Sequence, residues 1–346
     1  MATPKKVEPV ATPEMLNAIR AEASNSYQQN VPEATPFNLQ EVGNPILNYE
    51  AMANEFVNAL VNKIVAQLIE RKLWKNPLSI LRGNPMPLGM DIEAIHANPA
   101  EAMNYDGTEV GMADLLKMHK PDIATAYFRL NRQEKYPVTI NNQQLRGAFT
   151  SWGKLEDLIA YITDTLYNGA PIDDFKYTKQ LISDGLAANQ IVVQPTVNPI
   201  DETTGKQFMK TLRGLSLSFT FPSTAYNPYK LMGGTEKART TFTEIGDQVV
   251  LIRGDVAASV GVDVLSTLFN LEYGNYLTQN IVVDNFNDET TLAVLADRKA
   301  FVIAEQLRQF ANFYNASSLG WQYYYHVWDL FSLSPFHNMV ALRVAP

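Results

Sequence analysis

Apolar residues recur at helical spacing near the start of the chain. They stand four positions apart at Met52, Phe56, Leu60, Ile64 and Leu68. This spacing places one apolar stripe on a helix surface and predicts a helix over about residues 49–72. Upstream, Thr12 followed by Pro13 is typical of a helix start, and a thin apolar face predicts a helix that ends near Gln29.

A longer apolar stripe lies in the middle of the chain. It advances by three or four residues through Leu145, Phe149, Trp152, Leu155, Ile159, Ile162 and Leu166. We therefore expect one long helix over residues 141–169, stopped by Pro171. The same reasoning predicts further helices at 172–189, 203–215 and 255–270, with Asp255 as the N-cap of the last.

Runs of β-branched and aromatic residues predict strands. Two hairpins are expected, one joining residues 124–130 to 136–140 and one joining 292–296 to 300–304. Consecutive apolar positions in the second hairpin indicate burial on both faces of a sheet. One long aromatic strand is expected over residues 321–344. Together with strands at 191–195 and 249–253, the pattern indicates an α+β fold.

The segment between Trp74 and Ile140 contains little that could form its own core. Proline and glycine residues interrupt it repeatedly, and a short helix is expected only at residues 92–97. A structureless excursion of this length is unusual in a compact enzyme. We therefore expect an arm that packs on another subunit.

Composition and charge exclude several classes of protein. The chain has 346 residues, no cysteine, 28 Lys and Arg, and 36 Asp and Glu, which gives a formal net charge of -8. The absence of cysteine excludes thiolate chemistry and disulfides. The negative net charge disfavours a surface that binds nucleic acid phosphates. The sequence contains no run of about 18 apolar residues that would cross a membrane. Its polar start lacks the apolar core of a signal peptide, so we expect a soluble protein made inside the cell.

Motifs that carry chemistry are incomplete or missing. Neither the phosphate-binding loop, the nucleophile elbow nor the HExxH zinc motif occurs. His326 and His337 are expected to be structural, and His96 and His119 solvated. The acidic run from Asp284 to Glu289 lacks the calcium-binding register and is interpreted as a solvated loop. The adjacent pairs at residues 156–157 and 173–174 are interpreted as surface or capping charges, so no catalytic, cofactor-binding or metal-binding residue is assigned.

Several strings resemble the major capsid (head) proteins of small short-tailed phages of the Salasmaviridae type. The resemblance runs in order over roughly residues 31–342, in NPLSILRGNPMPLGMDIEAI, FRLNRQEKYPVTINNQQLRGAFTSWGKLED, VDVLSTLFN and WQYYYHVWDLFSLSPFHNMVAL. The last string is the most specific of them. The resemblance implies an HK97-like capsid fold and a structural protein of the virion, assembled in the cytoplasm of the host bacterium, that is not an enzyme and needs no cofactor.

This resemblance divides the chain into four parts. It implies an N-terminal arm and helix at 1–72, an E-loop hairpin at 73–140, a peripheral domain at 141–190 plus 316–346 with a long spine helix, and an axial domain at 191–315. Some relatives carry an immunoglobulin-like domain after this point, and we expect that decoration to be absent because the sequence ends at Pro346.

The resemblance also implies partners. It implies hexamers and pentamers of the chain itself, in an icosahedral or prolate shell, together with a scaffolding protein, a portal protein and packaged double-stranded DNA bound without sequence specificity. No membrane is implied. Apolar residues of the excursion are the expected contacts between subunits, namely Trp74, Leu78, Ile80, Leu81, Tyr127 and Phe128. Lys5 and Lys6 are the expected contacts to DNA or scaffold.

Two alternatives stay open at this point. One is an encapsulin-like nanocompartment shell of the same fold, which would enclose an enzyme. The other is a cytosolic hydrolase whose carboxylates are brought together by folding, because spatial pairs are invisible in one sequence.

Overall fold

The chain forms two compact units in the computed structural model. The structure describes residues 13–67, 74–102, 118–167, 169–231, 238–259, 280–318 and 320–344. Unit 1 comprises residues 1–75, 133–173 and 307–327, and unit 2 comprises residues 76–132, 174–306 and 328–346. No helix in the described ranges is long and apolar enough to cross a membrane.

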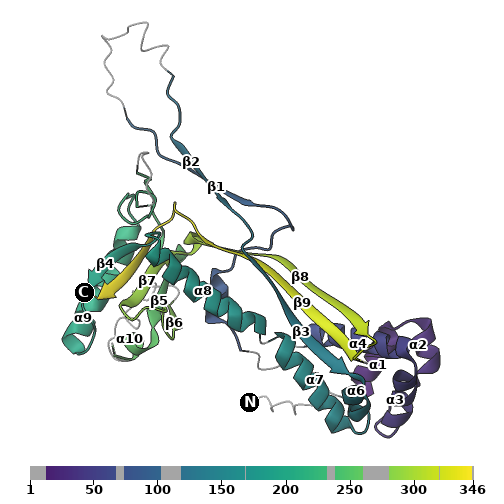
Figure 1. Cartoon of the computed structure of the whole chain (residues 1–346). Coiled ribbons are helices and arrows are strands. Elements are labelled where there is room, and N and C mark those ends of the chain that lie inside the picture. The colour runs from purple at the N-terminus through teal and green to yellow at the C-terminus, as the bar shows by residue number, and fades with distance from the viewer. Residues whose placement is uncertain are drawn as a thin grey trace, which may run out of the picture. The chain divides into compact units, whose positions relative to one another are not determined.

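Unit 1 is a helical layer packed on strands (Figure 1). Its helices are α1 (Pro13–Glu22), α2 (Asn25–Asn30), α3 (Leu39–Asn48), α4 (Glu50–Gln67), α6 (Asn142–Ala148) and α7 (Trp152–Tyr167). One core joins Ile19, Phe56, Leu145 and Ile162 from the helices to Tyr323 from a strand. The helix expected at 49–72 is confirmed as α4 over its described part, and residues 68–73 lie outside the described residues.

The expected single helix over residues 141–169 is wrong, because it is broken between α6 and α7. Phe149 leaves the helix there and packs against Phe56 with the ring planes tilted by 55° and the ring centroids 5.2 Å apart. Its ring also lies where a side chain of Gly43 would be, only 2.8 Å from an ideal Cβ. The apolar period continues across the break because both helices face the same core.

Strands β3 (Arg132–Asn141), β9 (Gly320–Leu333) and β8 (Phe301–Asn315) form a three-stranded sheet in the order β3-β9-β8. The expected hairpin of residues 124–130 with 136–140 is therefore wrong, since the second segment pairs with β9. The expected strand over residues 321–344 is also interrupted. Its second part is β10 (Met339–Val344), which belongs to a different sheet.

Unit 2 contains a five-stranded sheet in the order β4-β10-β7-β5-β6. The remaining strands of that sheet are β4 (Val192–Thr196), β7 (Thr291–Asp297), β5 (Gln248–Arg253) and β6 (Asn280–Val283). Alternate residues of β5 face two separate apolar cores. Val249 and Leu251 join the core that contains Ile182 of α8 (Gly169–Ala187). Val250 and Ile252 join the core that lies under α9 (Glu202–Phe219).

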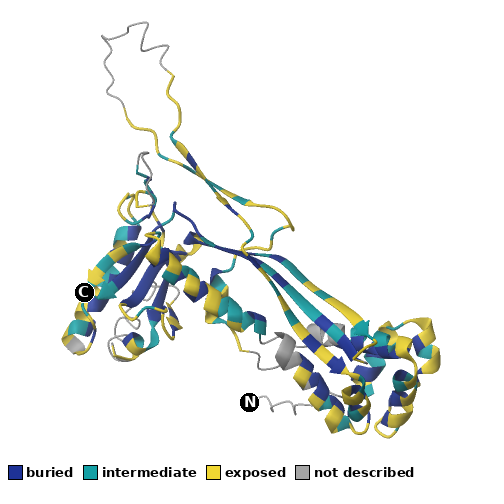
Figure 2. Cartoon of the chain, viewed as in Figure 1, coloured by how far each residue is buried: buried dark blue, intermediate teal, exposed yellow. Residues whose placement is uncertain are grey.

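This double burial explains the continuous apolar runs of the sequence. Every residue of β7 is buried, which confirms the expectation of two covered faces at residues 292–296. The hairpin expected there is wrong, since β7 pairs with β10 and β5 while β8 lies in the other sheet. Figure 2 shows the three central strands of this sheet, β10, β7 and β5, as mostly buried.

The excursion contains a third, two-stranded sheet formed by β1 (Ile92–Ala97) and β2 (Ile123–Phe128). The helix expected at residues 92–97 is therefore wrong, because these residues pair antiparallel with β2. Short helical segments complete unit 2: α10 (Gly254–Ser259) and 3-10 turns at Pro77–Leu81, Ile245–Asp247 and Arg298–Ala300. Asp255 is the second residue of α10 rather than its N-cap, and residues 260–270 of the expected helix lie outside the described residues.

Candidate functional site

The ribbon made by β1 and β2 has one covered face and one open face. Strand alternation places Glu93, Ile95 and Ala97 opposite Tyr127, Thr125 and Ile123, respectively. All six are exposed, whereas their neighbours in sequence are buried or half-buried. Figure 2 shows this alternation along the ribbon. We call the six exposed residues the outward face.

The outward face of the single chain carries large apolar side chains. Ile95 and Tyr127 are each 63% exposed and Ile123 is 50% exposed. The Tyr127 hydroxyl donates a hydrogen bond of 2.9 Å to the Glu93 carboxylate, and this bond raises the pKa of Tyr127. Both ribbon edges also lack a further strand among the described residues. A two-stranded ribbon with open edges and an apolar face is marginal in water without a partner.

The residues expected to contact a neighbour divide into two groups. Trp74 and Tyr127 are exposed, and Ile80 is half-buried. Leu78, Leu81 and Phe128 are buried within the chain itself, because the 3-10 turn Pro77–Leu81 packs into the core under α8 and Phe128 faces inward from β2. The apolar surface of these three side chains is therefore covered within the chain itself. Lys5 and Lys6 lie outside the described residues.

A cluster of paired charges holds together the segments that precede β1 and follow β2. Arg82 donates to Asp174 at 2.5 Å and to Asp329 at 2.9 Å. Arg132 donates to the same two carboxylates, with 3.1 Å to Asp329. Arg132 and Asp329 are almost completely buried, and the Arg132 guanidinium lies 4.6 Å from the Tyr177 ring centroid. We call these four charged residues the root cluster.

One feature of the sequence indicates the root cluster, although the spacing of apolar residues does not reveal it. Asp329 is a charged residue inside an aromatic strand, and charged residues are rarely buried unless they are paired. Asp174 was expected to be a surface or capping charge, and that expectation is wrong for this residue.

A second attachment lies where the ribbon passes residues 238–240. Asn98 follows β1 and Asp122 precedes β2, and the Asn98 amide donates to the Asp122 carboxylate at 2.7 Å. The buried Arg239 guanidinium donates to the other Asp122 oxygen at 2.8 Å. The Thr240 backbone N–H donates to the Asn98 side chain at 3.0 Å. We call Asn98, Asp122 and Arg239 the clamp.

His96 lies on the covered face of the ribbon, which corrects the expectation that it is solvated. Its ring stacks on Phe336 with centroids 5.6 Å apart. Burial lowers the pKa of His96, and the charge of Arg239 lowers it further. Burial also lowers the pKa of His337, although Asp297 opposes the shift. Neutral imidazoles therefore pack here in a structural role, while His119 is exposed.

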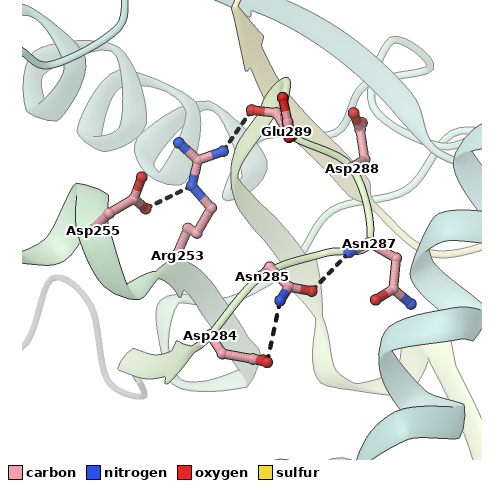
Figure 3. Close-up of a pocket in the computed structure, with 7 residues that line it drawn as sticks. All are labelled: Arg253, Asp255, Asp284, Asn285, Asn287, Asp288 and Glu289. Atoms are coloured by element: carbon pink, nitrogen blue, oxygen red, sulfur yellow. Dashed lines mark hydrogen bonds and ion pairs between the residues drawn. The ribbon is translucent and has the colours of Figure 1, made fainter.

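The acidic run after β6 lines an open depression with Arg253 (Figure 3). Each of its aspartates is already engaged within the chain. Asp284 binds Lys179 at 2.7 Å, Asp288 binds Arg343 at 2.8 Å, and Asp255 binds Arg253 at 2.6 Å. The described part of the chain contains no group of three or more histidine or acidic side chains arranged to hold a metal ion. The depression is therefore a set of ion pairs on the surface.

Comparisons with known proteins identify what the chain resembles. The family model for Phi29-like phage major capsid proteins matches residues 16–343. The major capsid protein of Bacillus phage B103 is 32% identical over 329 residues, which cover 95% of this chain and 72% of that protein. The major capsid protein of Bacillus phage PZA is 31% identical, with the same shares covered. The capsid structure of Staphylococcus phage Andhra superposes with a TM-score of 0.62 at 16% identity, covering 81% of this chain and 86% of that one.

Proposed function

The chain belongs to the Phi29-like phage major capsid protein family, and from this premise we propose that the outward face of its β1–β2 ribbon joins neighbouring copies in the head shell. As a major capsid protein the chain is a structural subunit of the phage virion and not an enzyme. Its α+β structure is the HK97-like capsid fold. The carboxylate-dependent hydrolase is therefore rejected, and the family favours a phage head over a nanocompartment.

One observation carries the proposal: three large apolar side chains lie exposed on one face of a narrow ribbon. Ile95, Ile123 and Tyr127 are each at least half exposed within their own chain. Covering them with a second copy removes apolar surface from water, at roughly 25 cal/mol per Å². Because every copy in a shell carries the same ribbon, this small gain is repeated at each subunit contact.

The parts of the fold take the roles that the family suggests. Residues 1–72 serve as the N-terminal arm and helix, residues 73–140 as the E-loop, residues 141–190 with 316–346 as the peripheral domain, and residues 191–315 as the axial domain. In this proposal Trp74 and Tyr127 contact a neighbouring copy, and hexamers and pentamers close the shell. A scaffolding protein and a portal protein take part in assembly.

The proposed cargo is double-stranded DNA held without sequence specificity. The support is electrostatic, since a net charge of -8 repels phosphates and leaves the packaged DNA free to move. Lys5 and Lys6 are the proposed local contacts to DNA or scaffold.

The test is a pair of matched double variants of the full chain, expressed alone and with the scaffolding protein of its phage. Ile95→Lys with Tyr127→Lys places two charges on the outward face, whereas Ile95→Val with Tyr127→Phe keeps it apolar. The lysine variant should fold normally, because exposed substitutions change stability by only about 0.5 kcal/mol. We expect it to remain as unassembled subunits in sedimentation and negative-stain microscopy, while the conservative variant forms shells. Normal shells from the lysine variant would disprove the ribbon's role.

A further inference from the structure

The clamp binds the ribbon at a second place, far along the excursion from the root cluster. Resting on the ribbon's proposed role, we propose that Asn98 and Asp122 are positioning residues. Held by Arg239 and its neighbours, they fix the ribbon before a second copy arrives.

The geometry of the clamp ties both strands to one segment of unit 2. Asn98 and Asp122 are joined by a backbone hydrogen bond of 3.0 Å as well as by their side chains. The Asn98 amide also donates to the Ala238 carbonyl at 3.1 Å, next to the Thr240 bond. The clamp therefore holds the end of β1 and the start of β2 at one point.

Electrostatics make this attachment stronger than a surface contact. The Arg239 side chain is 0% exposed, so its permanent charge requires a partner. Asp122 provides the anion at 2.8 Å, and the guanidinium also lies 4.8 Å from the Tyr229 ring centroid. The Asp122 side chain is 34% exposed, because it reaches from the ribbon to the buried cation. Releasing the ribbon would leave Arg239 without this carboxylate.

The two attachments bracket the paired strands. Arg82 and Arg132 anchor the segments before β1 and after β2, and the clamp anchors the ribbon beyond Ala97 and before Ile123. The outward face lies between them. A surface that is already ordered loses less conformational freedom on binding, which favours association. The clamp thus acts through the ribbon and not by touching the neighbouring copy.

Amide hydrogen exchange of the unassembled full chain tests the clamp. Asp122→Asn removes the anion facing Arg239, and Asn98→Ala removes the bonds to Ala238 and Thr240 while keeping Asp122. Asp91→Asn is the matched control, since Asp91 pairs on the same excursion with Arg129, a side chain that is 82% exposed. We expect at least about tenfold faster exchange in β1 and β2 for both clamp variants, with β5 and β7 unchanged. We expect the control to behave as the unsubstituted chain.

Assembly of the same variants is the second measurement. The clamp variants should form shells at least about tenfold more slowly than the control, followed by light scattering, because the ribbon must be ordered anew. Equal rates of amide exchange in β1 and β2 for Asp122→Asn, Asn98→Ala and Asp91→Asn would disprove the proposed role of the clamp. Faster exchange with unchanged assembly would overturn its positioning role. The ribbon's own role is tested separately: normal shells from the double-lysine variant would disprove it whatever the clamp variants do.

Discussion

Arg82, which precedes β1, and Arg132, which follows β2, donate hydrogen bonds to the same two carboxylates, Asp174 and Asp329. The segments that lead into β1 and out of β2 therefore meet at the same two carboxylates. Because Asp174 comes from α8 and Asp329 from β9, the root of the ribbon depends on elements that are distant in sequence.

Asp329→Asn should strongly destabilise unit 2. The substitution leaves the buried Arg132 with less compensating charge, and breaking a buried ion pair costs about 3–5 kcal/mol. Urea unfolding followed by tryptophan fluorescence measures the loss. Asp91→Asn removes an exposed pair and should cost at most about 1 kcal/mol, so equal midpoints for the two variants would contradict the burial of the root cluster.

Gly43→Ala should destabilise unit 1, although alanine is the better helix former. An ideal Cβ at Gly43 lies 2.8 Å from Cβ, Cγ and Cδ1 of Phe149, and such overpacking costs about 1–3 kcal/mol. Gly214→Ala is the matched control, because nothing lies within 4 Å of its Cβ in α9. The control should gain up to about 1 kcal/mol, and thermal unfolding should therefore shift in opposite directions for the two variants.

Gln248→Met should destabilise the contact between α9 and the sheet. The buried Gln248 amide donates to the backbone carbonyls of Ser216 and Thr243 at 2.9 and 3.1 Å. Methionine of similar shape removes both of these buried hydrogen bonds, at about 1–3 kcal/mol. The same change at exposed Gln309 should stay within about 0.5 kcal/mol in chemical unfolding. An equal effect at both positions would contradict this account.

Acid should weaken the fold partly through His96. Its pKa is lowered from 6.5 in the folded chain, so the unfolded chain binds the proton more tightly. The free energy of unfolding therefore falls as the pH drops below 6.5, until the folded-state pKa is passed. In His96→Gln, the unfolding midpoint should therefore change less with pH between about pH 7 and 5 than it does in the unsubstituted chain.

The exposed His119 provides the control for this measurement. His119→Gln should leave the slope of the unfolding midpoint against pH unchanged. An unchanged slope in His96→Gln would show that burial of this ring does not contribute to the acid sensitivity.

Helices were predictable where their signal is local. The four-residue spacing from Met52 to Leu60 predicts α4, and similar spacing predicts α9, because a helix forms its hydrogen bonds within its own segment. The break at Phe149 was not predictable, because it depends on the space beside Gly43, which comes from another helix. Likewise, α3 was missed, since Pro45 lies inside it and argues locally against a helix.

By itself, the sequence determined that this is an acidic, cysteine-free α+β chain with an interrupted apolar excursion and no complete catalytic motif, and its specific strings indicated the capsid family. Only the tertiary structure decided which strands pair, which apolar residues of the excursion stay exposed, and which charges meet. Strand partners and buried ion pairs are contacts between distant segments, so composition and periodicity do not encode them residue by residue. Leu78 and Tyr127 show the difference: both are large apolar residues of the excursion, yet Leu78 is buried in the core and Tyr127 is exposed.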